Sequence, residues 1–234
     1  METGTMPPLP EFAQRLALPL DHLRPPLQWR EIFGRPGPNA IEIGTGNGSF
    51  IVREAGALPH WNFLGVEREH KFYAKMLKRV GRAGRQNVRG VCREAVDLID
   101  TWIPENSVDR LYIFFSDPWP KRRHRSRRLV GPELLPHLER VLKAGADVRF
   151  KTDVDFYFNL AVTAFRRRPQ WDLIRLGRLG APDPAGDDVM TNFERKGREA
   201  GRRIWGVRAV MQHRPPETIA QPVDLQGVKR HGTD

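Results

Sequence analysis

Five acidic residues recur where the chain is expected to leave a strand: Glu42, Glu67, Glu94, Asp117 and Asp153. Each ends or directly follows a short apolar run of strand length. In an open α/β sheet, the carboxyl ends of parallel strands meet at one edge, and ligands bind there. We therefore expect these carboxylates to converge on one rim, where they favour a ligand with a positive centre and hydroxyl or amino donors.

A glycine-rich turn follows the first of these strands, residues 39–44, and precedes a predicted helix. Glycines at such a turn allow backbone angles closed to other residues and let a ligand lie against the main chain. The spacing Gly44, Gly46, Gly48 lacks the third glycine of the dinucleotide pattern, since position 49 is serine. Glu42 would repel a pyrophosphate and attract an ammonium or sulfonium centre. The turn therefore favours S-adenosylmethionine over NAD, with Gly44 and Gly46 against the cofactor.

The next two strands supply candidate contacts to a nucleoside. Glu67 ends an apolar strand 19 residues beyond Gly48, a position that suits the two ribose hydroxyls. The alternative is an ordinary surface glutamate. After the third strand, Glu94 is the candidate acceptor for the adenine amino group, with Ala95 beside it. Cys92 is interpreted as a small core residue rather than a nucleophile.

The fourth strand runs into Ser116-Asp117-Pro118-Trp119-Pro120, where two prolines prevent its continuation. Asp117 is therefore expected at a strand's carboxyl end beside an indole. Trp119 has two open interpretations, support of a substrate base or core packing.

The eight residues from Lys121 to Arg128 include six lysines or arginines. Cations this dense favour a polyanionic partner. Because they follow a strand-end carboxylate, we interpret them as a nucleic-acid contact, with a solvated loop or a nuclear-type signal as the alternative. The predicted phosphate contacts are Arg122, Arg123, Arg125, Arg127 and Arg128.

The composition agrees with an anionic partner. The 234 residues carry a formal net charge of +11, which favours nucleic acid first and an anionic membrane second. No stretch approaches the roughly 20 apolar residues of a spanning helix, and the N-terminus lacks a signal-peptide pattern. A single cysteine excludes an intramolecular disulfide and a cysteine-rich zinc site, and we expect no bound metal. A cytoplasmic protein is the simplest interpretation.

The distribution of prolines and of periodic segments predicts three parts: a proline-rich arm over 1–37, one α/β domain over 38–212 and a flexible tail over 213–234. Late in the domain, helical spacing predicts a helix over 131–143 that stops at Gly145. A strand over 147–153 follows it.

Several motifs in order and spacing resemble the bacterial tRNA (guanine-N7-)-methyltransferases, across about residues 39–211. They are EIGTGNG at 42–48, GVE at 65–67, FFSDPWPKRRHRSRRL at 114–129, KTDVDFY at 151–157 and TNFERKG at 191–197. The resemblance implies the class I methyltransferase fold, a Rossmann-like, mostly parallel seven-stranded sheet flanked by helices, with one antiparallel edge strand. It also implies methyl transfer from S-adenosylmethionine to N7 of a guanosine in tRNA, usually position 46 in the variable loop.

The same resemblance assigns roles to individual residues. Glu42, Glu67, Glu94 and Asp117 would bind the cofactor, and Asp117 would also be catalytic; Glu94 stands where the family usually has aspartate. The residues that would contact the substrate are Lys121, Asp153, Thr191, Asn192, Phe193 and Glu194. The protein would be a monomer or a homodimer with tRNA as its partner.

The implied chemistry suits these side chains. Guanine N7 carries a lone pair and no proton, so it attacks a sulfonium methyl without a strong general base. Asp117 or Asp153 would accept hydrogen bonds from guanine N1 and N2 and offset the positive charge that develops on the ring. The rival interpretations are a methyltransferase acting on an amino group, a non-catalytic RNA-binding protein and an NAD-dependent reductase.

Overall fold

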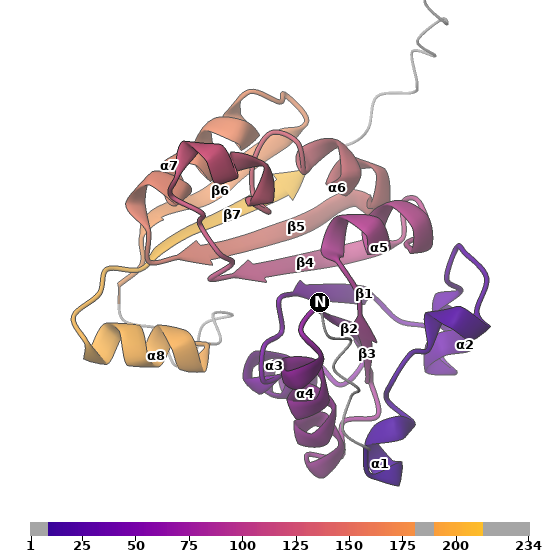
Figure 1. The fold of residues 1–234 in the computed structure, drawn as a ribbon. Helices are drawn as coiled ribbons and strands as arrows, with labels where there is room; N and C mark the ends of the chain where they lie inside the picture. Colours follow the sequence, from indigo (N-terminus) through magenta and orange to yellow (C-terminus); the bar gives the residue numbers. More distant parts are fainter. Residues whose placement is uncertain (1–8, 181–189, 213–234) are drawn as a thin grey trace, which may run out of the picture.

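The computed structural model describes residues 9–180 and 190–212. Its centre is one seven-stranded sheet with the strand order β3-β2-β1-β4-β5-β7-β6 (Figure 1). The strands are β1 (Asn39–Ile43), β2 (Asn62–Glu67), β3 (Val88–Cys92), β4 (Val108–Phe114), β5 (Leu142–Thr152), β6 (Trp171–Arg178) and β7 (Trp205–Met211).

The first five strands are parallel, and β7 runs antiparallel between β5 and β6. The prediction of a mostly parallel, seven-stranded sheet is confirmed. The antiparallel strand lies one place in from the edge, where it pairs with a strand on each side.

Helices cover both faces of the sheet, as Figure 1 shows. The alternation of side chains along β1 explains why: Ile41 and Ile43 point into one apolar cluster, and Ala40 points into another. The first cluster includes α5 (Ala95–Trp102), α6 (Leu135–Val141) and α7 (Asp155–Arg166). The second includes α3 (Ser49–Ala57) and α4 (His70–Arg82).

From residue 9 onward, the described part of the N-terminal segment contains only short elements, as its prolines predict. They are α1 (Glu11–Gln14), the 3-10 turn η1 (Leu20–His22) and α2 (Trp29–Phe33). Between them the chain pairs with the edge strand β3, because Gly90 donates to the carbonyl of Leu16 and accepts from the N–H of Leu18. This pairing covers an edge that would otherwise expose unpaired backbone groups. Phe33 is buried, so this part of the segment packs against the body of the protein.

Two element boundaries differ from the sequence prediction. The helix expected over 131–143 ends at Val141, and β5 already begins at Leu142, which pairs with Val108. Long-range strand pairing overrides the local helical spacing here. The predicted tail over 213–234 lies outside the described residues. Among the residues that the structure describes, no helix has the length and apolar character of a transmembrane segment.

Candidate active site

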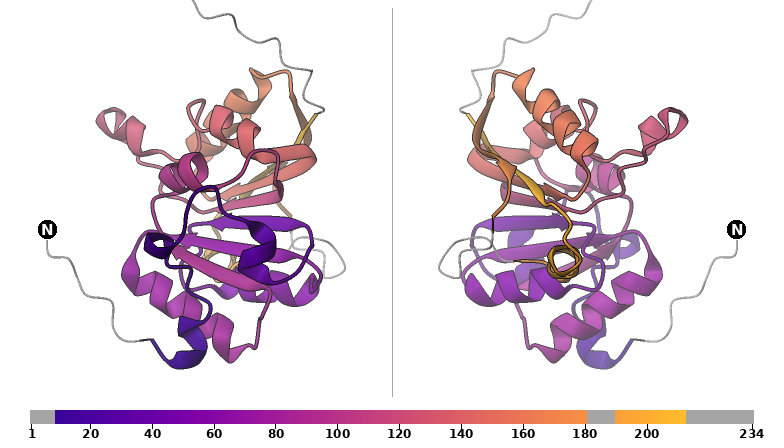
Figure 2. Two further views of the ribbon diagram at one scale, coloured as in Figure 1. Left: turned by 90° about the vertical axis from the view of Figure 1, so that its right-hand side faces the viewer. Right: turned by 90° about the vertical axis from the view of Figure 1, so that its left-hand side faces the viewer.

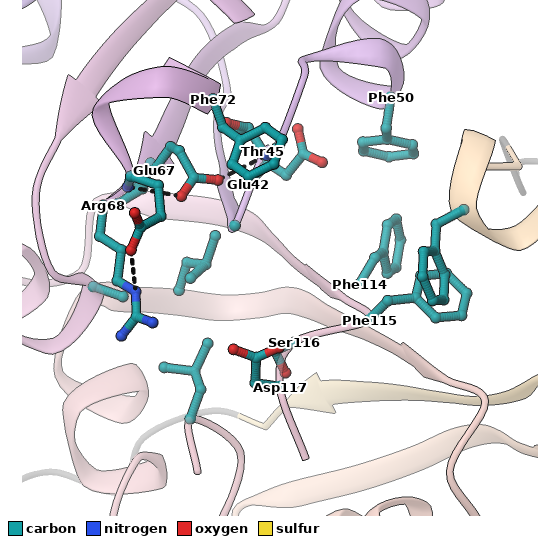
Figure 3. Close-up of a pocket in the computed structure, with 18 of the residues that line it drawn as sticks. Glu42, Thr45, Phe50, Glu67, Arg68, Phe72, Phe114, Phe115, Ser116 and Asp117 are labelled. Atoms are coloured by element: carbon teal, nitrogen blue, oxygen red, sulfur yellow. Dashed lines mark hydrogen bonds and ion pairs between the residues drawn. The ribbon is translucent and has the colours of Figure 1, made fainter. Parts of the chain in front are cut away.

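A cavity of about 540 Å³ opens at the carboxyl edge of the sheet. Figure 3 shows Glu42 and Glu67 on one side of it and Asp117 on the other. The predicted site residues that line it are Glu42, Gly44, Gly46, Glu67, Glu94, Ala95, Asp117, Thr191, Asn192 and Phe193. Four of the five strand-end acids therefore share one cavity. Asp153, Lys121 and Glu194 are not part of its lining.

The glycine turn after β1 is held by a carboxylate from β2. The backbone N–H of Gly46 donates to Glu67 Oε2 at 2.9 Å, and the N–H of Glu69 donates to Glu67 Oε1 at 3.0 Å. Gly44 and Gly46 have φ of 76° and 54°, the left-handed region that favours glycine. A Cβ at either position would meet no protein atom within 4 Å. The turn thus needs glycine for its backbone angles, and the space beside it is open to a ligand.

Glu42 is buried on the cavity wall, with 4% of its surface exposed. Its Oε2 atom has no hydrogen-bond partner among the described residues. Burial, with repulsion from Glu54 and Glu67, raises the pKa of Glu42 to about 8. A buried carboxylate beside other acids, with one oxygen lacking a partner among the described residues, is suited to a cationic ligand that supplies the counter-charge.

Glu94 is the N-cap of α5. Its Oε2 accepts hydrogen bonds from the backbone N–H groups of Val96 at 2.8 Å and Asp97 at 3.2 Å. The side chain therefore starts a helix as well as lining the cavity, and capping fixes its position.

The turn that presents Asp117 has strained backbone on both sides. Phe115 and Trp119 have φ of 55° and 42°, uncommon values for residues with a bulky side chain. The fully buried Tyr157 braces the turn: its Oη lies 3.2 Å from Ser116 Oγ and accepts from the N–H of Val130 at 2.9 Å. One hydroxyl thus joins the residues that flank the basic segment, Lys121–Arg128.

Trp119 lines the cavity and is half-buried, so the structure favours the site over the core for this residue. The Arg127 guanidinium lies 5.1 Å from the centre of its ring. Nε of Arg128 donates to the carbonyls of Pro118 and Trp119, both at 3.1 Å. These two arginines, predicted as phosphate contacts, therefore brace the turn that carries Asp117.

The basic segment itself forms a 3-10 turn, η2 (Arg122–Arg127), which projects from the body of the molecule (Figure 2). Lys121 and Arg123 are exposed there. The structure does not describe the side chains of Arg122 and Arg125.

Asp153 forms an ion pair with Arg202. The same guanidinium lies 4.7 Å from the ring centre of Phe193, whose other neighbour is the ring of Phe115 at 4.8 Å. Asp153 does not line the cavity itself. It pairs with Arg202, which packs on Phe193 in the cavity wall. The five acids do not all face one ligand, because the fifth already has a partner.

Glu194 lies in α8 (Asn192–Glu199), which begins with Thr191 as its N-cap. Thr191 Oγ1 accepts from the N–H of Glu194 at 2.9 Å, so its side chain caps the helix. The Glu194 side chain is fully buried and pairs with Lys151 at 2.9 Å and Arg198 at 2.7 Å. It anchors the helix whose first residues line the cavity.

The chain matches two groups of known proteins. A family model described as "Putative methyltransferase" matches residues 36–207. The tRNA (guanine-N(7)-)-methyltransferase of Saccharophagus degradans is 34% identical over 182 residues, 78% of this chain and 79% of that protein. The enzyme of the same name from Geobacillus kaustophilus is 35% identical, over 81% of this chain and 85% of its own. The chain belongs to the bacterial tRNA (guanine-N7-)-methyltransferase family.

Solved structures agree on the fold of this methyltransferase. The 16S rRNA methyltransferase KamB superposes with a TM-score of 0.58 at 14% identity, over 78% of this chain and 92% of that one. A 16S rRNA (adenine(1408)-N(1))-methyltransferase from Catenulisporales acidiphilia, solved with its cosubstrate SAM, superposes with a TM-score of 0.54 at 17% identity. It covers 81% of this chain and 92% of its own.

This family member is an S-adenosylmethionine-dependent methyltransferase, and its cavity fits that cofactor. The unpartnered Glu42 oxygen suits a cationic ligand, and the open space beside Gly44 and Gly46 admits one against the main chain.

Sequence reasoning missed three residues that shape the methyltransferase site: Phe72, Phe115 and Tyr157. Phe115 belongs to an apolar run that reads as core, and Phe72 lies in a helix that reads as a solvated surface. Tyr157 lies in the KTDVDFY motif, which was the available signal for it.

Proposed function

We propose that this methyltransferase transfers the methyl group of S-adenosylmethionine to N7 of a guanosine in tRNA, at position 46 of the variable loop. The observation that carries the proposal is the single cavity lined by Glu42 and Glu67 on one side and Asp117 on the other, with Trp119 and Arg127 at its wall. The names of the relatives support tRNA and guanine N7, and the motif resemblance supports the position. With tRNA as its substrate, the enzyme works in the cytoplasm.

Three acids would hold the cofactor. Glu42 would face its cationic part, because one of its buried oxygens has no hydrogen-bond partner among the described residues. Glu67 would accept from the ribose hydroxyls, and its bonds to Gly46 and Glu69 hold it in place. Glu94, with Ala95, would contact the adenine.

The bound cofactor supplies an electrophilic methyl group on a sulfonium sulfur. The N7 lone pair forms the new C–N bond as the S–C bond breaks and its electrons stay on sulfur. Because N7 carries no proton, the protein has none to remove, and catalysis depends on position and electrostatics. The purine ring becomes positively charged in this step.

Asp117 is the carboxylate best placed to offset that charge. It lines the cavity and is exposed, whereas Asp153 is paired with Arg202. We assign Asp117 the hydrogen bonds from guanine N1 and N2. Thr191, Asn192 and Phe193, which also line the cavity, would contact the base.

The remaining predicted substrate contacts would act from outside the cavity. Lys121 and Arg123 are exposed on the basic segment and would contact phosphates there. Asp153 and Glu194 would act indirectly, through Arg202 and through the position of α8.

A labelled-methyl assay tests the proposal. Purified protein is incubated with S-adenosylmethionine carrying a labelled methyl group and an unmodified tRNA transcript, and N7-methylguanosine is located by chain cleavage. The expected result is one labelled variable-loop guanosine, and no label in a transcript with adenosine at that position. Label on an exocyclic amino group would instead identify an amino methyltransferase, and cofactor and tRNA binding without label would identify a non-catalytic binder.

A further inference from the structure

One face of α4 carries a stripe of positive charge. Lys75, Lys78, Arg79 and Arg82 are spaced three, four and seven residues apart, which places them on the same side of the helix over about 10 Å. Lys75, Arg79 and Arg82 are exposed, and Lys78 is half-buried. The helix contains no aspartate or glutamate.

The four cations of this stripe have no carboxylate partner among the residues that the structure describes. Across the described residues, none of the four takes part in an ion pair, although exposed pairs form nearby, such as Arg68 with Glu69. Like charges three and four residues apart on a helix repel one another. A stripe of unpaired cations is therefore poised for an external anion.

The stripe lines a surface groove that continues into the active-site cavity. Asn47 and Phe72 line both the groove and the cavity, and Phe72 is 43% exposed. Trp119, just before the basic segment, and Arg127, within it, line the same cavity. The cavity is thus bounded by two positive surfaces, α4 and the segment around η2.

We propose that this α4 stripe binds phosphates of the tRNA backbone next to the target guanosine. This inference rests on the proposed function. The tRNA strand would cross the cavity between α4 and the basic segment, so that phosphates on both sides position the base over Asp117. An anionic membrane would also match the charge, but the continuity of the groove with a base-sized cavity favours RNA.

A charge-reversal pair tests the stripe. The variant Lys75→Glu/Arg79→Glu removes two stripe cations on exposed positions of α4. Its control, Arg166→Glu/Arg167→Glu, makes the same charge change on exposed positions at the end of α7, which packs on the opposite face of the sheet. Both variants are first compared with the wild type by thermal unfolding and by S-adenosylmethionine binding, which we expect to be unchanged.

The readout is tRNA affinity measured over a range of salt concentrations. We expect the α4 variant to bind tRNA at least tenfold more weakly, with the slope of log affinity against log salt shallower by about one per lost phosphate contact. Methyl transfer at limiting tRNA should fall with the affinity, because the stripe contacts would position the base. The control variant should lose less than threefold in affinity.

Three outcomes would overturn the inference. Equal weakening in both variants would mean that only net charge matters, and unchanged tRNA binding would mean that the stripe makes no contact. Loss of binding to phosphatidylserine-containing vesicles with tRNA binding intact would identify a membrane surface. Binding is measured without turnover, so a wild type that binds tRNA through α4 yet transfers no methyl would contradict only the proposed function.

Discussion

The Lys151 ammonium lies 2.9 Å from Oε2 of Glu194, and the two side chains are only 5% and 0% exposed. Glu194 also pairs with Arg198 through its other oxygen. The pair with Lys151 joins α8 to the end of β5, next to the strand that presents Asp117, and the pair with Arg198 lies within α8. The beginning of α8 at the cavity wall therefore depends on a buried carboxylate that does not face the cavity itself.

Replacing Glu194 should loosen α8. Glu194→Gln would remove the buried carboxylate that pairs with Lys151 and Arg198, and we expect a loss of about 3–5 kcal/mol in the free energy of unfolding. Methyl transfer should fall with it, while S-adenosylmethionine binding persists in the folded fraction. Urea unfolding and cofactor titration measure both. The control is Glu199→Gln in the same helix, which breaks an exposed pair with Arg195 and should cost less than about 0.5 kcal/mol. Similar losses in both variants would refute the anchoring role.

Glu42 should make cofactor binding depend on pH. Its pKa of about 8 means that the carboxyl is protonated at neutral pH and must lose that proton to face a cation. Affinity for S-adenosylmethionine should therefore rise up to about tenfold per pH unit as pH approaches 8, and then level off. Calorimetric titration in buffers of different ionisation enthalpy would detect the released proton. A flat pH profile for the wild type would rule out this coupling.

The same residue should lower the stability of the protein without its cofactor. The pKa of Glu42 is higher in the folded state than its usual 4.5, so the folded protein holds an extra proton between pH 4.5 and about 8, and stability falls as pH rises through that window. Glu42→Gln removes this dependence and should stabilise the unliganded protein by on the order of 2 kcal/mol at pH 7, while weakening cofactor binding. Denaturant unfolding of both proteins at pH 5 and pH 8 checks the sign. Glu42→Gln should stabilise the unliganded protein more at pH 8 than at pH 5, and the reverse order would contradict the prediction.

Asp117→Asn should separate catalysis from tRNA binding. It keeps the shape of the side chain and removes the charge that would offset the methylated purine, so we expect the turnover rate to fall about 100-fold or more. The affinity for tRNA should change less than threefold, since phosphate contacts dominate it. Single-turnover rates and filter binding measure the two quantities. Parallel losses in rate and affinity would assign Asp117 to binding alone.

Tyr157→Phe should loosen the basic segment. The substitution leaves the N–H of Val130 without its buried acceptor, which costs about 1–3 kcal/mol, and it frees Ser116 from its partner. We expect a higher KM for tRNA and a lower turnover rate, with the cofactor affinity retained. Tyr73→Phe is the matched control, because its hydroxyl also bonds a backbone group, the carbonyl of Gly90, but away from the turn. Unchanged kinetics in Tyr157→Phe would show that the turn keeps its shape without the brace.

The order of the elements and the glycine turn are predictable from sequence, because they depend on short-range patterns. Apolar runs of strand length alternate with helical spacing, and the carboxyl ends of parallel strands share one edge. The placement of Glu42, Glu67 and Asp117 around one cavity follows from that rule. The cap at Thr191 is also a local feature, because a cap and its helix are neighbours in the chain.

The partners of the remaining acids come from long-range packing. In the sequence, Asp153 is equivalent to the other strand-end acids. In the structure it pairs with Arg202, which lies 49 residues later in the chain. In the sequence, Glu194 is expected to contact the substrate. In the structure its side chain is buried and pairs with Lys151, which lies 43 residues earlier in the chain. In the sequence, the α4 stripe is typical of a solvated helix face. In the structure it lines a groove together with Asn47, at the mouth of the cavity. Spacing along the chain assigns a residue to an edge or a face, whereas its electrostatic partner depends on which distant element packs there.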